Sequence, residues 1–170
     1  AAVDSSMAAG ITARLWQADF APDAILQTVN AALLVKSREE SLATLDVAAI
    51  DTHSGRLDLY KAGAAATLLR SGGRLSRLEN TGLPVGILPE VSFAHSRDVL
   101  NAGDILLMIS DGALAGGMAA VEEILAAHPD DEDLQTLAQT IVDAAVAAEG
   151  HHPDDITVIA LRLSLLSEAE

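Results

Sequence analysis

The sequence predicts an α+β fold in which helices pack on antiparallel β-sheet. Apolar residues recur with helical spacing over the first 34 positions, strand-like segments joined by turns follow from position 42, and two helical segments precede a last strand. Helices and strands therefore occur in separate runs, which is typical of helices lying on antiparallel sheet and not of alternating parallel units.

Two helices are expected at the start of the chain. Residues 3–18 and 22–34 both carry an apolar stripe of helical period. Pro22 occupies the first turn of the second segment, where the missing N–H group costs no hydrogen bond. The position of this proline therefore supports a helix that begins there.

The middle of the chain is expected to form strands joined by tight turns. Residues 53–56 and 71–73 each separate two strand-like stretches, so each closes a hairpin, and the stretches together suggest an antiparallel meander. The apolar run at 104–109 suits a buried central strand. The expected strands are 42–52, 57–61, 65–70, 74–79, 91–99, 104–109 and 156–164, with further helices at 118–127 and 133–149.

Composition excludes several kinds of protein. The 170 residues fit a single domain, 1–170, and contain no cysteine, which rules out disulfides, thiolate metal sites and cysteine nucleophiles. The net charge is -15 and the 10 basic residues are scattered, without the basic face that nucleic-acid binding needs. No apolar run approaches the roughly 20 residues that cross a bilayer, so membrane attachment is expected only through a region outside this chain.

Two acidic turns stand beside predicted core strands. Asp111 and Gly112 follow the apolar strand, and Asp154 and Asp155 precede the last one. If these strands are antiparallel neighbours, both turns lie at one edge of the sheet, where their carboxylates suit a hard divalent cation such as Mg²⁺ or Mn²⁺. Gly112 suits a backbone that bends tightly beside a metal.

Other interpretations of these polar residues stay open. Aspartate beside glycine or aspartate is also ordinary turn chemistry without any ligand. The adjacent His151 and His152 could be zinc ligands, although neighbouring residues in an extended chain point opposite ways. His53, His95 and His128 are expected to be isolated and partly solvated.

Four segments in order resemble a known family, the metal-dependent serine/threonine phosphatases of the PPM type, in the bacterial branch that includes stage II sporulation protein E and related sigma-factor regulators. The second segment is a Leu-Pro-x-Gly loop, the third ends in Ser-Asp-Gly, and the fourth is the final acidic turn. Their order, spacing and agreement with the predicted strands make the combination specific. The segments are 43–46, 82–88, 102–112 and 154–158, and the resemblance covers residues 1–163.

The resemblance implies a particular fold and metal site. The fold would be an antiparallel β-sandwich flanked by helices, with two Mn²⁺ or Mg²⁺ ions in a cleft at one end. Asp111 and Asp154 resemble the family's catalytic metal-binding carboxylates. Asp155 takes the second role if the alignment shifts by one residue, and Gly112 belongs to the first metal turn.

One part of the family pattern is missing. The phosphatases also carry an upstream Asp-Gly-x-Gly motif, whose aspartate bridges the two metals, whereas this sequence opens on the helix that follows it. We therefore expect an N-terminally incomplete phosphatase domain, either a fragment or a degenerate relative. A homodimer could cover the sheet edge that the missing strands leave exposed.

The resemblance implies hydrolysis of phosphoserine or phosphothreonine on a protein by metal-activated water. It also implies a phosphorylated anti-anti-sigma protein of the STAS type as substrate and partner, in sporulation or stress signalling, and a cytoplasmic location. Two alternatives remain: a catalytically silent phosphatase-like module that binds a partner, and an α+β domain whose acidic turns are only turns.

Overall fold

A computed structural model describes residues 2–36, 43–79, 82–91, 93–149 and 155–164. The described residues form two compact units. The first unit draws them from the ranges 1–49, 58–64 and 80–96, and the second from 50–57, 65–79 and 97–170. In these ranges no helix has the length and apolar character needed to span a bilayer.

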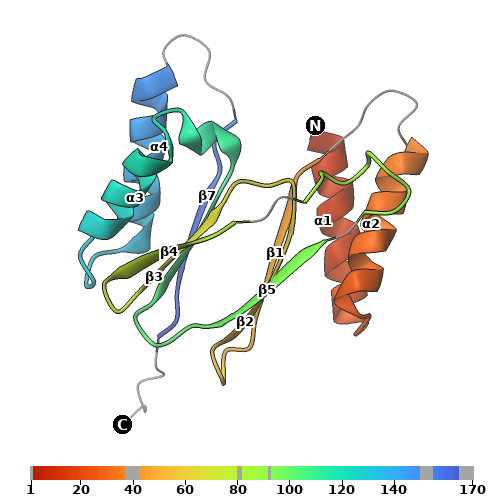
Figure 1. The fold of residues 1–170 in the computed structure, drawn as a ribbon, viewed down its shortest axis with the longest axis horizontal. Coiled ribbons are helices and arrows are strands. Elements are labelled where there is room, and N and C mark those ends of the chain that lie inside the picture. Colours follow the sequence, from red (N-terminus) through yellow and green to blue (C-terminus); the bar gives the residue numbers. More distant parts are fainter. Residues whose placement is uncertain (1, 37–42, 80–81, 92, 150–154, 165–170) are drawn as a thin grey trace. The chain divides into compact units, whose positions relative to one another are not determined.

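The first unit contains two packed helices and most of a three-stranded sheet. α1 (Ala2–Gln17) and α2 (Pro22–Lys36) lie side by side (Figure 1). The strand order of the sheet is β1 (Leu45–Ile50), β2 (Arg56–Ala62), β5 (Ala94–Val99). Both helices therefore form where the apolar stripes predict them.

A small apolar core holds this unit together. Val29 and Leu33, which belong to the stripe that predicted α2, are fully buried in it. Burying such side chains contributes about 1.5 to 3 kcal/mol each, so the apolar face of α2 is what fixes the helix on its unit. The buried members of the core are Ala8, Val29, Leu33, Ala62 and Val85.

A side-chain amide on α2 holds the loop at residues 82–91. Asn30 is fully buried, and its Nδ2 donates to the carbonyl oxygens of Leu88 at 2.9 Å and Pro89 at 3.3 Å. Its Oδ1 accepts the N–H of Gly86 at 2.8 Å. Because one amide satisfies three main-chain groups of the loop, α2 determines the path of the segment that resembles the family's Leu-Pro-x-Gly loop.

The second unit is a four-stranded antiparallel sheet with two helices on one face. α3 (Met118–Ala127) and α4 (Leu134–Glu149) pack on each other and on the sheet (Figure 1). All five residues of β6 are apolar and β6 lies between two other strands, so the predicted buried central strand is confirmed. The strand order is β4 (Arg74–Leu78), β3 (Thr67–Ser71), β6 (Ile105–Ile109), β7 (Val158–Arg162).

The expected continuous meander is wrong. β1 neighbours β2 and β3 neighbours β4, as the hairpins predict, but β2 and β3 belong to different sheets. β3 pairs instead with β6, with Leu68 opposite Leu107. Alternation of apolar and polar residues along a strand shows which residues share a face, but it does not show which strand lies next to it. The sequence pattern therefore could not predict the pairing of β3 with β6. The α+β class, with helices and antiparallel strands, is confirmed.

Candidate metal centre

The pairing of β6 with β7 brings the two acidic turns to the same sheet edge. The strands are antiparallel, with Ile109 opposite Val158, so the chain leaves β6 where it enters β7. The N–H of Ser110 donates to the carbonyl oxygen of Thr157 at 3.0 Å and extends the pairing beyond the two strands. The predicted neighbourhood of the two turns is therefore present.

Asp111 begins the turn that follows β6. It is the first residue of a short 3₁₀-helix, η1 (Asp111–Leu114), which the sequence pattern did not predict. The residue is exposed, and its Oδ1 accepts the N–H of Gly112 at 3.1 Å. A carboxylate has about four lone-pair sites, so this one bond leaves acceptor capacity for a cation.

Gly112 brings the main chain of the first turn against that of the second. The residue is buried, and a Cβ built on it would lie 2.6 Å from the carbonyl oxygen of Asp155. Gly112 is not among the glycines with positive φ. The glycine is therefore required for the close approach of two backbones, and not for the tight bend that the sequence suggested.

Ser110 links the turns through its hydroxyl group. Its Oγ accepts the N–H of Thr157 at 2.9 Å and donates to the carbonyl oxygen of Asp155 at 3.2 Å. Asp155 itself is exposed, as is Asp111. Two exposed acidic residues thus stand on turns that are tied together by main-chain and hydroxyl hydrogen bonds.

The residues at this edge fit a hard divalent cation. The two turns offer carboxylate and carbonyl oxygens, which are the ligands that Mg²⁺ and Mn²⁺ prefer. The carbonyl oxygen of Asp155 lies where a side chain at residue 112 would begin. The predicted ligand Asp154 lies outside the described residues, as do His151 and His152. Within the part of the chain that the structure describes, no three histidine, aspartate or glutamate side chains are grouped to hold a metal. The described residues of the two turns that carry a carboxylate are Asp111 and Asp155.

Comparison with known proteins decides the family. The family model described as Stage II sporulation protein E (SpoIIE) matches residues 1–164. This chain belongs to the SpoIIE family. The resemblance seen in the sequence is thereby confirmed, and one family model spans both compact units.

One relative in sequence and two solved phosphatase structures are similar to this SpoIIE-family chain. Stage II sporulation protein E of Bacillus subtilis (strain 168) is 26% identical in an alignment of 144 residues that covers 81% of this chain and only 17% of that relative. The solved phosphatase domain of SpoIIE from Bacillus subtilis, presoaked with Mn, has a TM-score of 0.65 at 21% identity, over 93% of this chain and 72% of that one. The Mycobacterium tuberculosis serine/threonine phosphatase PstP/Ppp has a TM-score of 0.77 at 20% identity, over 96% and 82%. The SpoIIE-family chain therefore shares the fold of these phosphatases.

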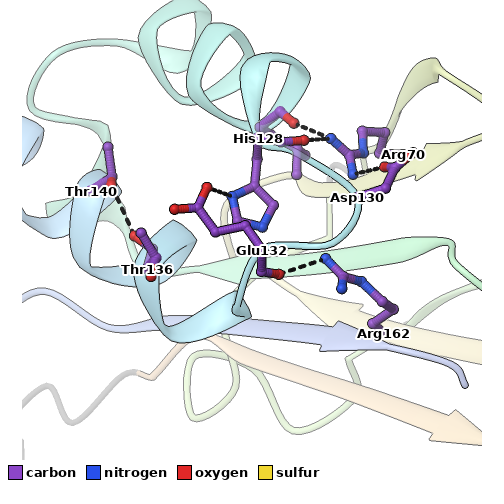
Figure 2. Close-up of polar contacts among 8 residues, drawn as sticks. Arg70, His128, Asp130, Glu132, Thr136, Thr140 and Arg162 are labelled. Atoms are coloured by element: carbon purple, nitrogen blue, oxygen red, sulfur yellow. Dashed lines mark hydrogen bonds and ion pairs between the residues drawn. The ribbon is translucent and has the colours of Figure 1, made fainter.

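The SpoIIE-family chain also holds a buried polar cluster that the sequence analysis missed. Arg70 is 8% exposed and donates to the carbonyl oxygens of Leu125 at 3.0 Å and of His128, while its Nη2 donates to Asp130 Oδ1 at 2.6 Å (Figure 2). His128, expected to be partly solvated, is buried, with Nδ1 3.6 Å from a carboxylate oxygen of Glu132. The signal available in the sequence was an arginine directly after the apolar pair Leu68 and Leu69 of a predicted strand. The cluster contains none of the predicted site residues and joins β3 to the end of α3.

Proposed function

We propose that this chain is part of a metal-dependent protein serine/threonine phosphatase in which Asp111 and Asp154 hold Mn²⁺ or Mg²⁺. The observation that supports this best is the antiparallel pairing of β6 with β7, which puts Asp111 and Asp155 at one sheet edge in a chain of the SpoIIE family. Gly112 belongs to the site because the absence of a side chain leaves room for the carbonyl group of Asp155. Asp155 belongs to it as the carboxylate beside Asp154.

The residues of the proposed site supply oxygen ligands and no nucleophile. When bound, a divalent cation acts as a Lewis acid toward phosphoryl oxygens and activates water at neutral pH. Asp111 and Asp154 would hold the cation, with Asp155 as the ligand in place of Asp154 if the alignment shifts by one residue. The chain has no cysteine, so a thiolate phosphatase mechanism is excluded.

We infer that the substrate is a phosphoprotein, and more narrowly a phosphorylated anti-anti-sigma protein of the STAS type in sporulation or stress signalling. The support is the family: the relative from Bacillus subtilis is named for sporulation, and its solved phosphatase domain is described as that of a cell fate determinant. Scattered basic residues and a net charge of -15 argue against nucleic acid. A cytoplasmic location, a homodimer and a membrane tether outside this chain belong to the same proposal.

A second candidate function is a catalytically silent phosphatase-like module that binds a partner. A module of this kind would bind its partner without needing the cation. The two candidates differ in whether Mn²⁺ is required.

The test is phosphate release by the full-length protein from a phosphoserine STAS-type protein, with and without Mn²⁺. Asp111→Asn should lower the Mn²⁺-dependent rate about 100-fold or more, which corresponds to about 2.7 kcal/mol of transition-state stabilisation. Asp143→Asn, which removes the same charge from the exposed face of α4, is the matched control and should leave the rate unchanged.

Two results would contradict the proposal. Phosphate release that persists without any divalent cation would exclude the metal mechanism. A folded, Mn²⁺-loaded protein that releases no phosphate from phosphoserine proteins would instead support the silent module.

A further inference from the structure

Ser110 stands at the junction of the two acidic turns. Its hydroxyl group accepts the N–H of Thr157 at 2.9 Å and donates to the carbonyl oxygen of Asp155 at 3.2 Å. Thr157 and Asp155 belong to the second turn, whereas Ser110 directly precedes Asp111 in the first. One side chain thus connects both halves of the candidate metal centre.

This connection replaces a regular rung of the β-ladder. Opposed residues of an antiparallel pair alternate between hydrogen-bonded and non-hydrogen-bonded positions, and at a hydrogen-bonded position the two residues exchange both N–H···O=C bonds. Ser110 donates its N–H to Thr157 in the usual way, but the return bond from Thr157 ends on the serine hydroxyl. The carbonyl oxygen of Ser110 accepts the N–H of Ala113 at 3.1 Å instead, within the turn that forms η1. Because the hydroxyl group accepts the N–H of Thr157, the carbonyl oxygen of Ser110 is available to η1. The pairing of β6 with β7 and the start of η1 therefore meet at Ser110.

The hydroxyl group of Ser110 does not cap η1, although Ser110 directly precedes that helix. A serine in front of a helix normally accepts N–H groups of the first helical turn. Ser110 has the extended backbone of a capping residue, with φ -80° and ψ 166°, yet makes no such side-chain bond. The carbonyl group of Asp155 that it holds is also the one that Gly112 approaches closely. Ser110 and Gly112 therefore act on the same carbonyl group.

We propose that Ser110 is a positioning residue of the metal centre, whose hydroxyl group sets the separation of the two acidic turns. The inference rests on the proposed metal-dependent function and adds a residue that acts through Asp111 and the second turn. Without the hydroxyl group, the N–H of Thr157 and the carbonyl oxygen of Asp155 lose their common partner. The bond from the N–H of Ser110 to Thr157 then remains between the turns, and Asp111 is free to shift relative to Asp155.

The experiment measures Mn²⁺ binding by the full-length protein from the electron paramagnetic resonance signal of free Mn²⁺, with thermal unfolding recorded in parallel. Ser110→Ala should weaken Mn²⁺ binding about 10- to 100-fold, which is typical for residues that orient metal ligands. Ser110→Thr keeps the hydroxyl group and should bind Mn²⁺ like the wild type. Asp111→Asn reports on the site itself and should abolish binding.

The outcomes separate this inference from the proposed function. If Asp111→Asn loses Mn²⁺ while a folded Ser110→Ala binds it like the wild type, the role of Ser110 is refuted and the proposed function stands. If the wild type binds no Mn²⁺, or Asp111→Asn binds it unchanged, the metal-dependent function fails and the role of Ser110 fails with it.

A second readout covers the case in which Ser110→Ala does not fold. If the cation needs the bridge between the turns, saturating Mg²⁺ must in turn stabilise that bridge in the wild type, because coupling is reciprocal. Hydrogen exchange of the Thr157 amide should then slow by about threefold or more on adding Mg²⁺. Exchange that is the same with and without Mg²⁺ would overturn the inference.

Discussion

At the scale of single residues, the candidate metal centre depends on close contact between two stretches of main chain. Ser110 and Gly112 flank Asp111 and both act on the carbonyl group of Asp155. The serine holds that group by a hydrogen bond, and the glycine leaves it room. A carboxylate that must share a cation with a neighbouring turn needs such restraint, because errors of about 1 Å in the position of a site residue already weaken its function.

Replacing Gly112 by alanine should disrupt the contact between the turns. The new Cβ would lie 2.6 Å from the carbonyl oxygen of Asp155, so one of the two backbones must move. We expect Mn²⁺ affinity to fall by about tenfold or more and the free energy of unfolding to fall by about 1 to 3 kcal/mol. Calorimetric titration with Mn²⁺ and urea unfolding measure the two effects.

Gly116→Ala is the matched control for Gly112→Ala. Its new Cβ would meet the Cβ atoms of Ala120 and Ala148 at the ordinary distances of 3.6 and 3.7 Å. Mn²⁺ binding should therefore be unchanged in this variant. If the two variants bound Mn²⁺ equally well, the close approach at Gly112 would have no part in the site.

At the scale of helices and strands, polar side chains hold the ends of elements in place. The buried Arg70 on β3 binds carbonyl groups at the end of α3, and the half-buried Arg162 on β7 donates to the carbonyl oxygen of Glu132 at 3.2 Å (Figure 2). The buried Asn30 does the same for the loop beside α2. A buried main-chain carbonyl without a partner costs about 1 to 3 kcal/mol, so Arg70 and Asn30 stabilise the arrangement by satisfying such groups.

Replacing Arg70 by lysine should destabilise the second unit although the charge is kept. The planar guanidinium reaches two carbonyl oxygens and Asp130 at once, whereas a lysine ammonium offers its donors from a single atom. We expect a loss of about 2 to 4 kcal/mol in the free energy of unfolding, measured by urea titration.

The control for this substitution is Arg77→Lys on β4. Arg77 pairs with Glu122 at the surface, where its side chain is 43% exposed, so the loss should stay below about 1 kcal/mol. Equal losses in the two variants would show that the fork geometry of Arg70 is not needed.

At the scale of the whole molecule, the charge balance is strongly acidic, with 25 acidic and 10 basic residues. The exposed Asp51 and the half-buried Glu122 are nevertheless stabilised in their charged form. The N–H groups of His53 and Ser54 hold the pKa of Asp51 below its ordinary value. Hydrogen bonds from the guanidinium of Arg77 do the same for the pKa of Glu122.

These lowered pKa values predict a loss of stability in acid. Because each group binds its proton less readily in the folded chain than in the unfolded one, its contribution is fully present above the ordinary pKa and disappears as the pH falls through the folded pKa. Thermal unfolding from pH 7 to pH 3 should show this loss below about pH 4.5. In the plot of melting temperature against pH, Glu122→Gln should make the decrease at acid pH, the acid limb, shallower.

Arg77→Gln checks the cause of that change, because it removes the same ion pair from the other side. It should flatten the acid limb as Glu122→Gln does, and combining both substitutions should add nothing further. An acid limb that keeps its wild-type slope in both variants would show that the pair does not contribute to the pH dependence.

Much of the candidate site was predictable, because its residues stand in short segments with recognisable chemistry. The turns containing Asp111 and Asp155 were expected to share a sheet edge if their strands are antiparallel neighbours, and the pairing of β6 with β7 meets this condition. The hydroxyl bridge from Ser110 was not predictable, since its partners lie 45 and 47 positions away in the sequence. The burial of His128 was missed for the same reason, because the residues that cover a side chain are not its sequence neighbours.

The sequence by itself determined the helices, the strands and the family, because these depend on the spacing of apolar residues and on short motifs that are read locally. Only the tertiary structure decided how the strands are divided between two sheets and why residue 112 must be glycine. Both depend on which distant segments of the chain exchange hydrogen bonds, and that choice is made by packing the whole chain and not by the preferences of any one segment.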